Sequence, residues 1–392
     1  MPSALLAVIY LAFVSLGLPD GLLGAAWPTM HAALGAAVSS AGIVSCIICF
    51  GTIVSSLLTD RLVRTLGTGI LTAASVALTA LALFGFSTAA SFWQLILWAI
   101  PYGLGAGAVD AALNAYVALH AEARHMNWLH CCWGIGAAAG PLIMAAAIAR
   151  GAGWQGGYIA VGAIQAALVA VLVLSLRLWE KRPRSETGYR ESRAAAASRR
   201  DLMHIPGVWQ ALVGFFFYCA LESCCGLWTP TFLVLGHDID AGSAALVGSL
   251  FYAGITAGRL VCGILTLRMA GQELLHLGEA IIGTGVVVLI LAPAGSLPFL
   301  AAGVVLLGLG CAPIYPQMIQ LTPSRFGSQH AQSLMGLQMA CAYIGSLSAP
   351  PLLGLLMEHI SPVLFVPAAA MLLAAMTACL ASCDRQAAKA RA

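Results

Sequence analysis

Residues 179–206 read WEKRPRSETGYRESRAAAASRRDLMHIP and form the one long polar linker of the chain. Both flanks consist mainly of apolar runs of about 20 residues, the length with which a helix crosses a hydrocarbon core of about 30 Å. Six such runs precede the linker and six follow it. The sequence therefore predicts an all-α membrane protein of twelve transmembrane helices. We expect two pseudo-symmetric six-helix bundles, over 1–178 and 207–392, joined by the linker over 179–206.

The twelve predicted helices are separated by short connections that leave no room for water-soluble domains. They cover 4–26, 41–59, 68–87, 92–117, 128–149, 156–178, 207–235, 243–265, 275–294, 298–320, 331–355 and 363–382. Of the 392 residues, 60% are hydrophobic and only 8% are charged. Soluble domains carry about 25% charged residues, so this composition cannot cover a surface that faces water. The first run lacks a basic segment before it, so we interpret it as a membrane helix rather than a cleaved signal peptide.

Basic residues indicate how the chain is oriented. Sixteen of the 18 Lys and Arg residues fall in the linker, the tail and the loops that share their face of the membrane. This asymmetry follows the positive-inside rule, so we expect both termini and the linker to be cytoplasmic and the protein to lie in the plasma (inner) membrane. The net charge of +3 is too small to indicate a nucleic-acid partner.

The 12 cysteines predict neither a disulfide framework nor a metal site, and no cofactor is indicated. Nearly all of them lie in apolar runs, where cysteine behaves as a small apolar residue. The adjacent pairs Cys131–Cys132 and Cys224–Cys225 would lie on helices, where neighbouring side chains point about 100° apart and do not converge on one ion.

The two halves of the chain repeat each other at an offset of about 200 residues, as duplicated carriers do. The first helix reads Asp20-x3-Gly24-x3-Pro28 and the seventh reads Glu222-x3-Gly226-x3-Pro230. In the fifth helix Gly134-Ile135-Gly136 precedes Gly140-Pro141, and in the eleventh Tyr343-Ile344-Gly345 precedes Ala349-Pro350. Duplicated bundles with a binding site between them are the architecture of alternating-access carriers.

With these motifs the chain resembles the major facilitator superfamily over essentially its whole length. Thr59-Asp60-Arg61-Leu62-Val63-Arg64 is similar to the family's loop between helices two and three, although Ser56 and Val63 replace its glycines. Within the family the chain is most similar to the fucose permease branch of sugar–cation symporters. That similarity rests on Asp20, on Gly103-Leu104-Gly105-Ala106-Gly107 before Asp110 and Asn114, on Glu222, and on Asn127-Trp128-Leu129-His130.

The resemblance implies that Asp20 and Asp110 take part in proton coupling and sugar recognition, although the family's helix-four acid is typically Glu. Their position supports this, because a charge at mid-bilayer costs about 2.5–3.5 kcal/mol and needs a partner, a cavity or a proton. Glu222 also lies within an apolar run and is expected to take part in proton coupling for the same reason. His130 can titrate near neutral pH and share a proton with Asp110. The alternative for each is structural: Pro19 frees carbonyls that Asp20 can help to satisfy, and His130 can bond a neighbouring helix.

Two further sets of residues are candidates for binding and gating. We expect a sugar to contact amide and aromatic side chains in the spans, although such residues more often serve packing: Asn114, Asn127, Trp228, Gln317, Gln338 and Tyr343. The resemblance implies that Asp60, Arg61 and Arg64 latch the cytoplasmic side; alternatively, Asp60 caps helix three and the arginines anchor topology. Arg259 near the cytoplasmic end of helix eight either extends to the interface or pairs with an acid of the other half as a gate.

The leading functional prediction is uptake of a small neutral solute, a sugar, with protons by rocking of the two bundles in a monomer within the lipid bilayer. The alternative on the same fold is proton-driven export of drugs or metabolites. A non-transporting sensor or scaffold would need a soluble partner domain, for which the 28-residue linker offers little room. An enzyme is not indicated, because the sequence contains no phosphate loop, nucleophile elbow or clustered metal ligands.

Overall fold

The computed structural model describes residues 3–120, 123–179, 202–293 and 295–389. These residues contain twelve helical spans that are long and apolar enough to cross a membrane, which confirms the predicted number. The first span is broken into α1 (Ser3–Gly17) and α2 (Leu22–Ala33). The remaining spans of the first half are α3 (Ser40–Leu66), α4 (Thr68–Ser87), α5 (Phe92–His120), α6 (Ala123–Ala149) and α7 (Gly153–Leu174), which continues into η1 (Ser175–Leu178).

The second half follows the same order. Its spans are α9 (Val208–His237), α10 (Ala241–Leu265), α11 (Gly271–Leu291), α12 (Leu297–Gln320), α14 (Ser328–His359) and α15 (Phe365–Lys389). A short α13 (Thr322–Phe326) connects α12 to α14, and η3 (Pro362–Leu364) precedes α15. Most of the predicted linker, residues 180–201, lies outside the described residues.

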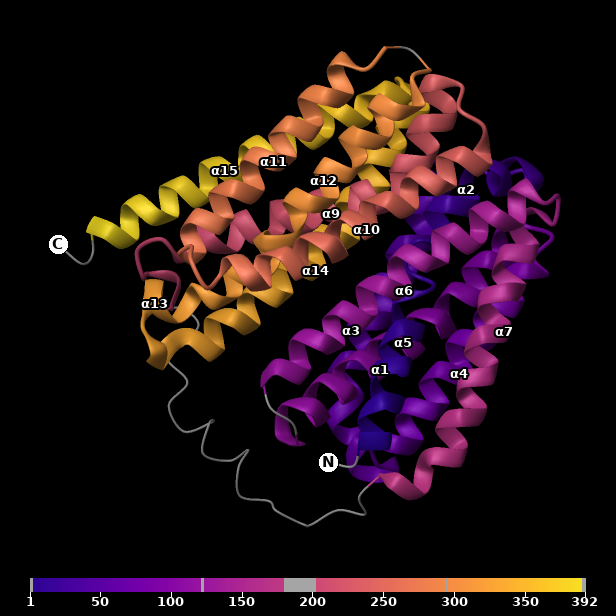
Figure 1. Ribbon diagram of the computed structural model, residues 1–392, viewed down its shortest axis with the longest axis horizontal. Helices are drawn as coiled ribbons and strands as arrows, with labels where there is room; N and C mark the ends of the chain where they lie inside the picture. Colours follow the sequence, from indigo (N-terminus) through magenta and orange to yellow (C-terminus); the bar gives the residue numbers. More distant parts are fainter. Residues whose placement is uncertain (1–2, 121–122, 180–201, 294, 390–392) are drawn as a thin grey trace.

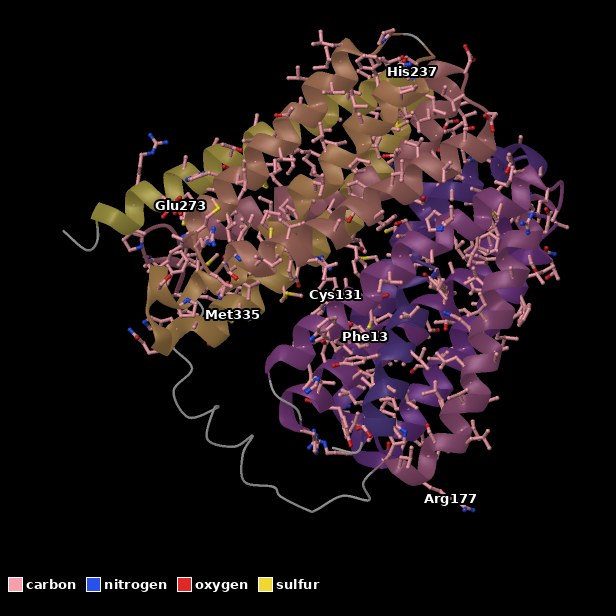
Figure 2. All side chains as sticks on the ribbon, viewed as in Figure 1. Phe13, Cys131, Arg177, His237, Glu273 and Met335 are labelled. Atoms are coloured by element: carbon pink, nitrogen blue, oxygen red, sulfur yellow. The ribbon has the colours of Figure 1, made fainter. Side chains whose placement is uncertain are left out.

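Helices α1–α7 form one bundle and α9–α15 the other, and the two diverge from a common end (Figure 1). Both chain ends lie where the bundles are apart. We call this the linker end, because Arg177, the last basic residue before 180–201, also lies there (Figure 2). The opposite end, where the bundles meet, carries His237 (Figure 2) and is called the far end.

Small residues bring the bundles together toward the far end. A Cβ on Gly24 of α2 would lie 2.7 Å from the carbonyl oxygen of Leu227 and 2.8 Å from that of Gly226, so Gly24 packs directly on the backbone of α9. Nearby, the backbone N–H of Ser39 donates to Oε2 of Glu358 at 3.0 Å and joins the start of α3 to the end of α14. The space between the bundles is therefore closed here.

The internal repeat predicted from the sequence corresponds to equivalent helix contacts. A Cβ on Gly136 of α6 would overlap the carbonyl oxygen of Val14 in α1. A Cβ on Gly345 of α14 would overlap the carbonyl oxygen of Phe216 in α9. In each half a glycine thus lets the fifth helix of the bundle pack directly on the backbone of the first.

Candidate transport site

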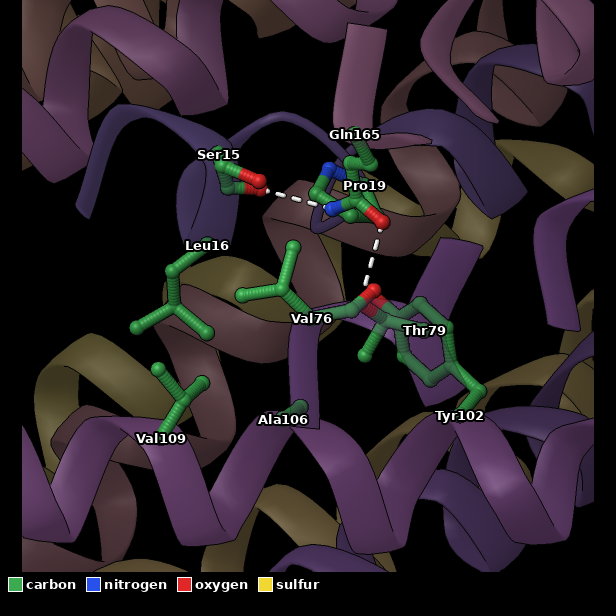
Figure 3. A pocket seen from close by; sticks show the side chains of 9 residues that line it. All are labelled: Ser15, Leu16, Pro19, Val76, Thr79, Tyr102, Ala106, Val109 and Gln165. Atoms are coloured by element: carbon green, nitrogen blue, oxygen red, sulfur yellow. Dashed lines mark hydrogen bonds between the residues drawn. The ribbon is translucent and has the colours of Figure 1, made fainter. Parts of the chain in front are cut away.

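Asp20 lies in the break between α1 and α2, where residues 18–21 form turns instead of one continuous helix. Pro19 has no N–H and therefore cannot bond the carbonyl of Ser15 four residues earlier. The side chain of Gln165 in α7 takes that role: its Nε2 donates to the Ser15 carbonyl at 2.9 Å (Figure 3). Oγ1 of Thr79 in α4 donates to Oε1 of Gln165 at 3.0 Å and fixes the orientation of the amide (Figure 3). The break is thus held by side chains from two other helices.

A small cavity lies directly beneath this break. Its walls include Pro19, Ser15, Gln165 and Tyr102, and it is drawn in Figure 3. The Ser15 hydroxyl is buried and has no hydrogen-bond partner among the described residues. A buried polar group of this kind is commonly satisfied by an ordered water. The cavity borders the site, because Tyr102 also interacts electrostatically with Asp20.

The Asp20 carboxyl faces the space between the bundles and is exposed. Its Oδ2 accepts a hydrogen bond of 2.7 Å from Nε1 of Trp133 in α6. Asp110 and Glu222 lie within electrostatic range of the same carboxyl. The structure therefore brings together the three acids that the sequence singled out, one each from the first, fourth and seventh spans.

Asp110 and Asn114 form the pair expected one turn apart on α5. Nδ2 of Asn114 donates to Oδ1 of Asp110 at 2.9 Å, and both side chains are half-buried. Tyr343 of α14, in the other bundle, interacts electrostatically with Asp110. An acid, an amide and a phenol from both bundles thus converge, which is a suitable arrangement for hydroxyl groups of a solute.

Glu222 lies on α9 within range of Arg259 in α10 and of the Tyr218 hydroxyl. The Arg259 guanidinium does not extend to the helix end: its carbon lies 5.1 Å from the centre of the Trp133 ring in the opposite bundle. This differs from both expectations for Arg259, since the cross-bundle partner is an aromatic ring rather than an acid. A face-on arginine within about 6 Å of a tryptophan ring is a cation–π contact.

His130 is exposed one turn before Trp133 on α6. Its ring meets Phe13 edge-on at 6.1 Å between centres, and it interacts electrostatically with Arg259. These contacts differ from the one expected from the sequence, which was with Asp110. Asn127 belongs to the same helix, but its side chain lies outside the described residues.

Three predicted solute-binding residues are instead buried within the C-terminal bundle. Nε1 of Trp228 donates to the Pro350 carbonyl at 2.9 Å, and its side chain is fully buried. Oε1 of Gln338 accepts from Thr322 at 2.9 Å. The Gln317 amide is also buried, beside Gly271 at the start of α11. In this conformation all three contribute to packing between helices rather than to the space around Asp20.

The predicted gate residues Asp60, Arg61 and Arg64 lie on the last turns of α3, which extends to Leu66 and not to residue 59. Asp60 therefore does not cap the third span, whose N-cap is Gly67. Within α3, Nε of Arg64 donates to the Asp60 carbonyl at 3.2 Å. All three side chains are exposed.

The sequence interpretation missed several residues that matter here. It gave no role to Trp133, Gln165 or Tyr252. The ring of Tyr252 packs against Gly21, and Tyr252 interacts electrostatically with Asp20 and Glu222. A polar Gln165 inside an apolar run was the available signal for the helix-break contact. The sequence interpretation also gave no role to Glu279, which is 8% exposed inside α11 and lies 3.0 Å from Nδ1 of His276.

Comparison with known proteins agrees with this architecture. No curated protein sequence matches the chain. Among solved structures it resembles the nucleoside transporter NupG, with a TM-score of 0.75, 13% identity and coverage of 96% of this chain and 100% of that one. It also resembles a bacterial homologue of the human lysosomal transporter Spinster in an inward-facing, occupied state, with a TM-score of 0.69, 14% identity and coverage of 98% and 95%.

The unoccupied inward-facing form of the Spinster homologue gives a similar result, with a TM-score of 0.70, 14% identity and the same coverage. At such identities these likenesses establish the fold. The sequence itself matches the Major Facilitator Superfamily over residues 9–295 and 234–391, which together span most of the chain. The chain is a multi-pass integral membrane protein and belongs to the major facilitator superfamily of transporters.

Proposed function

We propose that this transporter moves a small neutral, hydroxyl-rich solute of the sugar type together with protons, by alternating access. The observation that carries the proposal is the convergence of Asp20, Asp110 and Glu222 between the two bundles. Carboxyl groups at membrane depth are retained where they face water, bind a partner or take up a proton. A group that is exposed in one conformation and enclosed in another can load a proton on one side and release it on the other.

The chemistry around the acids supports a neutral solute. Among the described residues, three carboxyl groups share the region with the guanidinium of Arg259, so the excess negative charge disfavours anions. Tyr102, Tyr252 and Tyr343 supply hydroxyl groups and aromatic faces around Asp20 and Asp110. Sugars and nucleosides both present hydroxylated rings, and a nucleoside transporter is among the structural neighbours. We therefore include nucleosides with the sugars of the fucose permease branch as test solutes.

We further propose that the linker end is cytoplasmic. The basic residues gather in the linker, the tail and the loops of that face. Because the bundles meet at the far end and diverge toward the linker end (Figure 1), the conformation described is then open to the cytoplasm. In the opposite conformation Asp60, Arg61 and Arg64 would approach the other bundle and act as the latch.

Ligand binding by the purified protein tests this proposal. Thermal unfolding should be measured with a panel of hexoses, 6-deoxyhexoses and nucleosides, and proton exchange should be followed with a pH indicator in weak buffer. We expect at least one of these solutes to stabilise the wild type and to change its proton binding, since a ligand that binds the folded state raises the unfolding temperature.

D20N and D110N should lose the proton response. The matched control D238N replaces an exposed acid at the end of α9 and should retain it. Stabilisation by lipophilic cations, with none from any sugar or nucleoside, would contradict the proposal and favour the drug exporter.

A further inference from the structure

Trp133 connects the two bundles through its indole N–H and through the face of its ring. Its indole N–H donates to the carboxyl of Asp20 in its own bundle at 2.7 Å. Its ring carries the Arg259 guanidinium of the other bundle, 5.1 Å from the ring centre. The contacts Asp20–Trp133 and Trp133–Arg259 therefore form a continuous bridge from the helix break in the N-terminal bundle to α10 in the C-terminal bundle.

The two contacts of Trp133 reinforce each other. Donation of the indole N–H to a carboxylate polarises the ring toward greater electron density, and an electron-rich face binds a cation more strongly. Protonation of Asp20 removes the negative charge of the carboxylate and turns a charge-assisted hydrogen bond into a neutral one, which is about half as strong. The Trp133 ring is then less polarised and binds Arg259 more weakly.

Other ionisable groups also lie around the Asp20–Trp133–Arg259 bridge. Arg259 has Glu222 of its own bundle within electrostatic range, which is an alternative partner once the ring contact weakens. Among the described residues, the titratable and charged groups that interact with Asp20 or Arg259 include the following: Asp110, Glu222, Tyr102, Tyr252, His130, Tyr218, Cys131 and Cys311.

We propose that Trp133 is a positioning residue that transmits the protonation state of Asp20 to the contact between α6 and α10. With Asp20 ionised, Trp133 holds Arg259 against the N-terminal bundle. With Asp20 protonated, Arg259 turns to Glu222 and the bundles are free to rearrange. The inference rests on the proposed function insofar as Asp20 is the group that takes up the proton.

Hydrogen–deuterium exchange of the purified full-length protein tests the bridge without transport. Exchange of α6 and α10 peptides should be compared at about pH 5.5 and about pH 8.5, after correction for the intrinsic pH dependence of amide exchange. We expect about two- to fivefold stronger protection of the wild type at the higher pH, the range that a cation–π contact supports. D20N should give the low-pH pattern at both values.

Variants of the tryptophan separate its two contacts. W133F retains a ring for Arg259 but loses the N–H, so it should keep partial protection and lose the pH response. W133L and R259Q should show weak protection at both pH values. The control W128L removes an exposed tryptophan from the same helix and should behave as wild type. A W133L protein that is folded by size-exclusion chromatography and retains the wild-type pH response would overturn the proposal.

The two proposals fail differently. If no solute is transported but hydrogen–deuterium exchange of α6 and α10 still depends on pH and on Trp133, the proposed function is refuted and the bridge is supported. If transport is proton-coupled while W133L exchanges and transports as wild type does, only the bridge falls.

Discussion

Replacement of Gln165 by leucine removes the contact that holds the helix break. Two hydrogen bonds are lost, from Nε2 to the Ser15 carbonyl at 2.9 Å and from Thr79 to Oε1 at 3.0 Å. The Thr79 hydroxyl still bonds the Val76 carbonyl, but Pro19 offers the Ser15 carbonyl no N–H. A buried acceptor left without a donor costs about 1–3 kcal/mol, so we expect Q165L to lower the free energy of unfolding by about that amount.

Equilibrium unfolding in mixed micelles of a mild detergent and sodium dodecyl sulfate measures this loss. The control Q155L replaces an exposed glutamine on the same helix and should stay within about 0.5 kcal/mol of wild type. Adding T79V should cost less in Q165L than in the wild type, because the partner is already absent. If Q165L is as stable as Q155L, the Gln165 amide does not stabilise the helix break through the Ser15 carbonyl, and the prediction is refuted.

Two further predictions concern the stability of single helices and are measured by the same unfolding assay. D240A should cost about 1 kcal/mol at neutral pH, because Oδ1 of Asp240 caps α10 by accepting from the Ser243 N–H at 2.9 Å. The Ser243 bonds lower the pKa of Asp240 below 3.8, so this contribution is present above that pH and is lost as the pH falls through the lowered value. G136A should destabilise by about 1–3 kcal/mol, because the added methyl would overlap the Val14 carbonyl, whereas G263A meets no neighbour and should stabilise by about 0.5–1 kcal/mol.

Opposite results would contradict these two predictions. A D240A deficit that persists unchanged in acid would show that the cap acts through something other than an ionised carboxylate; D240N, which can still cap, serves as the control. Equal effects of G136A and G263A would show that the close approach of α6 to α1 does not determine the cost.

The architecture could be predicted because it depends on local features of the sequence. Apolar runs of membrane-crossing length and one polar linker suffice for the number and order of the helices. Asp20, Asp110 and Glu222 could also be singled out from the sequence, since an acid within an apolar run needs a reason to be there. That they share one region could not be predicted. The repeat of acid, glycine and proline further placed Gly24 and Gly226 at equivalent positions. Gly24 packs on the α9 backbone, and Gly226 leaves room for the Tyr252 hydroxyl.

The partners of the polar side chains could not be predicted, because they depend on how each helix is rotated in its bundle. Gln338 and Trp228 were assigned to the solute, yet their hydrogen bonds go to Thr322 and Pro350. Conversely, Trp133 has the sequence context of an ordinary membrane tryptophan, and only its contacts with Asp20 and Arg259 distinguish it. A single sequence does not reveal contacts between helices that are far apart in the chain.

Gradient-driven accumulation in proteoliposomes tests the central claim most directly. A driving force of about 100 mV is worth about 2.3 kcal/mol per proton, enough for up to about 50-fold accumulation of a neutral solute. We predict that an inward proton gradient drives accumulation of at least one of radiolabelled L-fucose, D-glucose or uridine, that an ionophore abolishes it, and that D20N leaves only equilibration. Uptake that never exceeds equilibration in the wild type, with or without the gradient, would contradict the account.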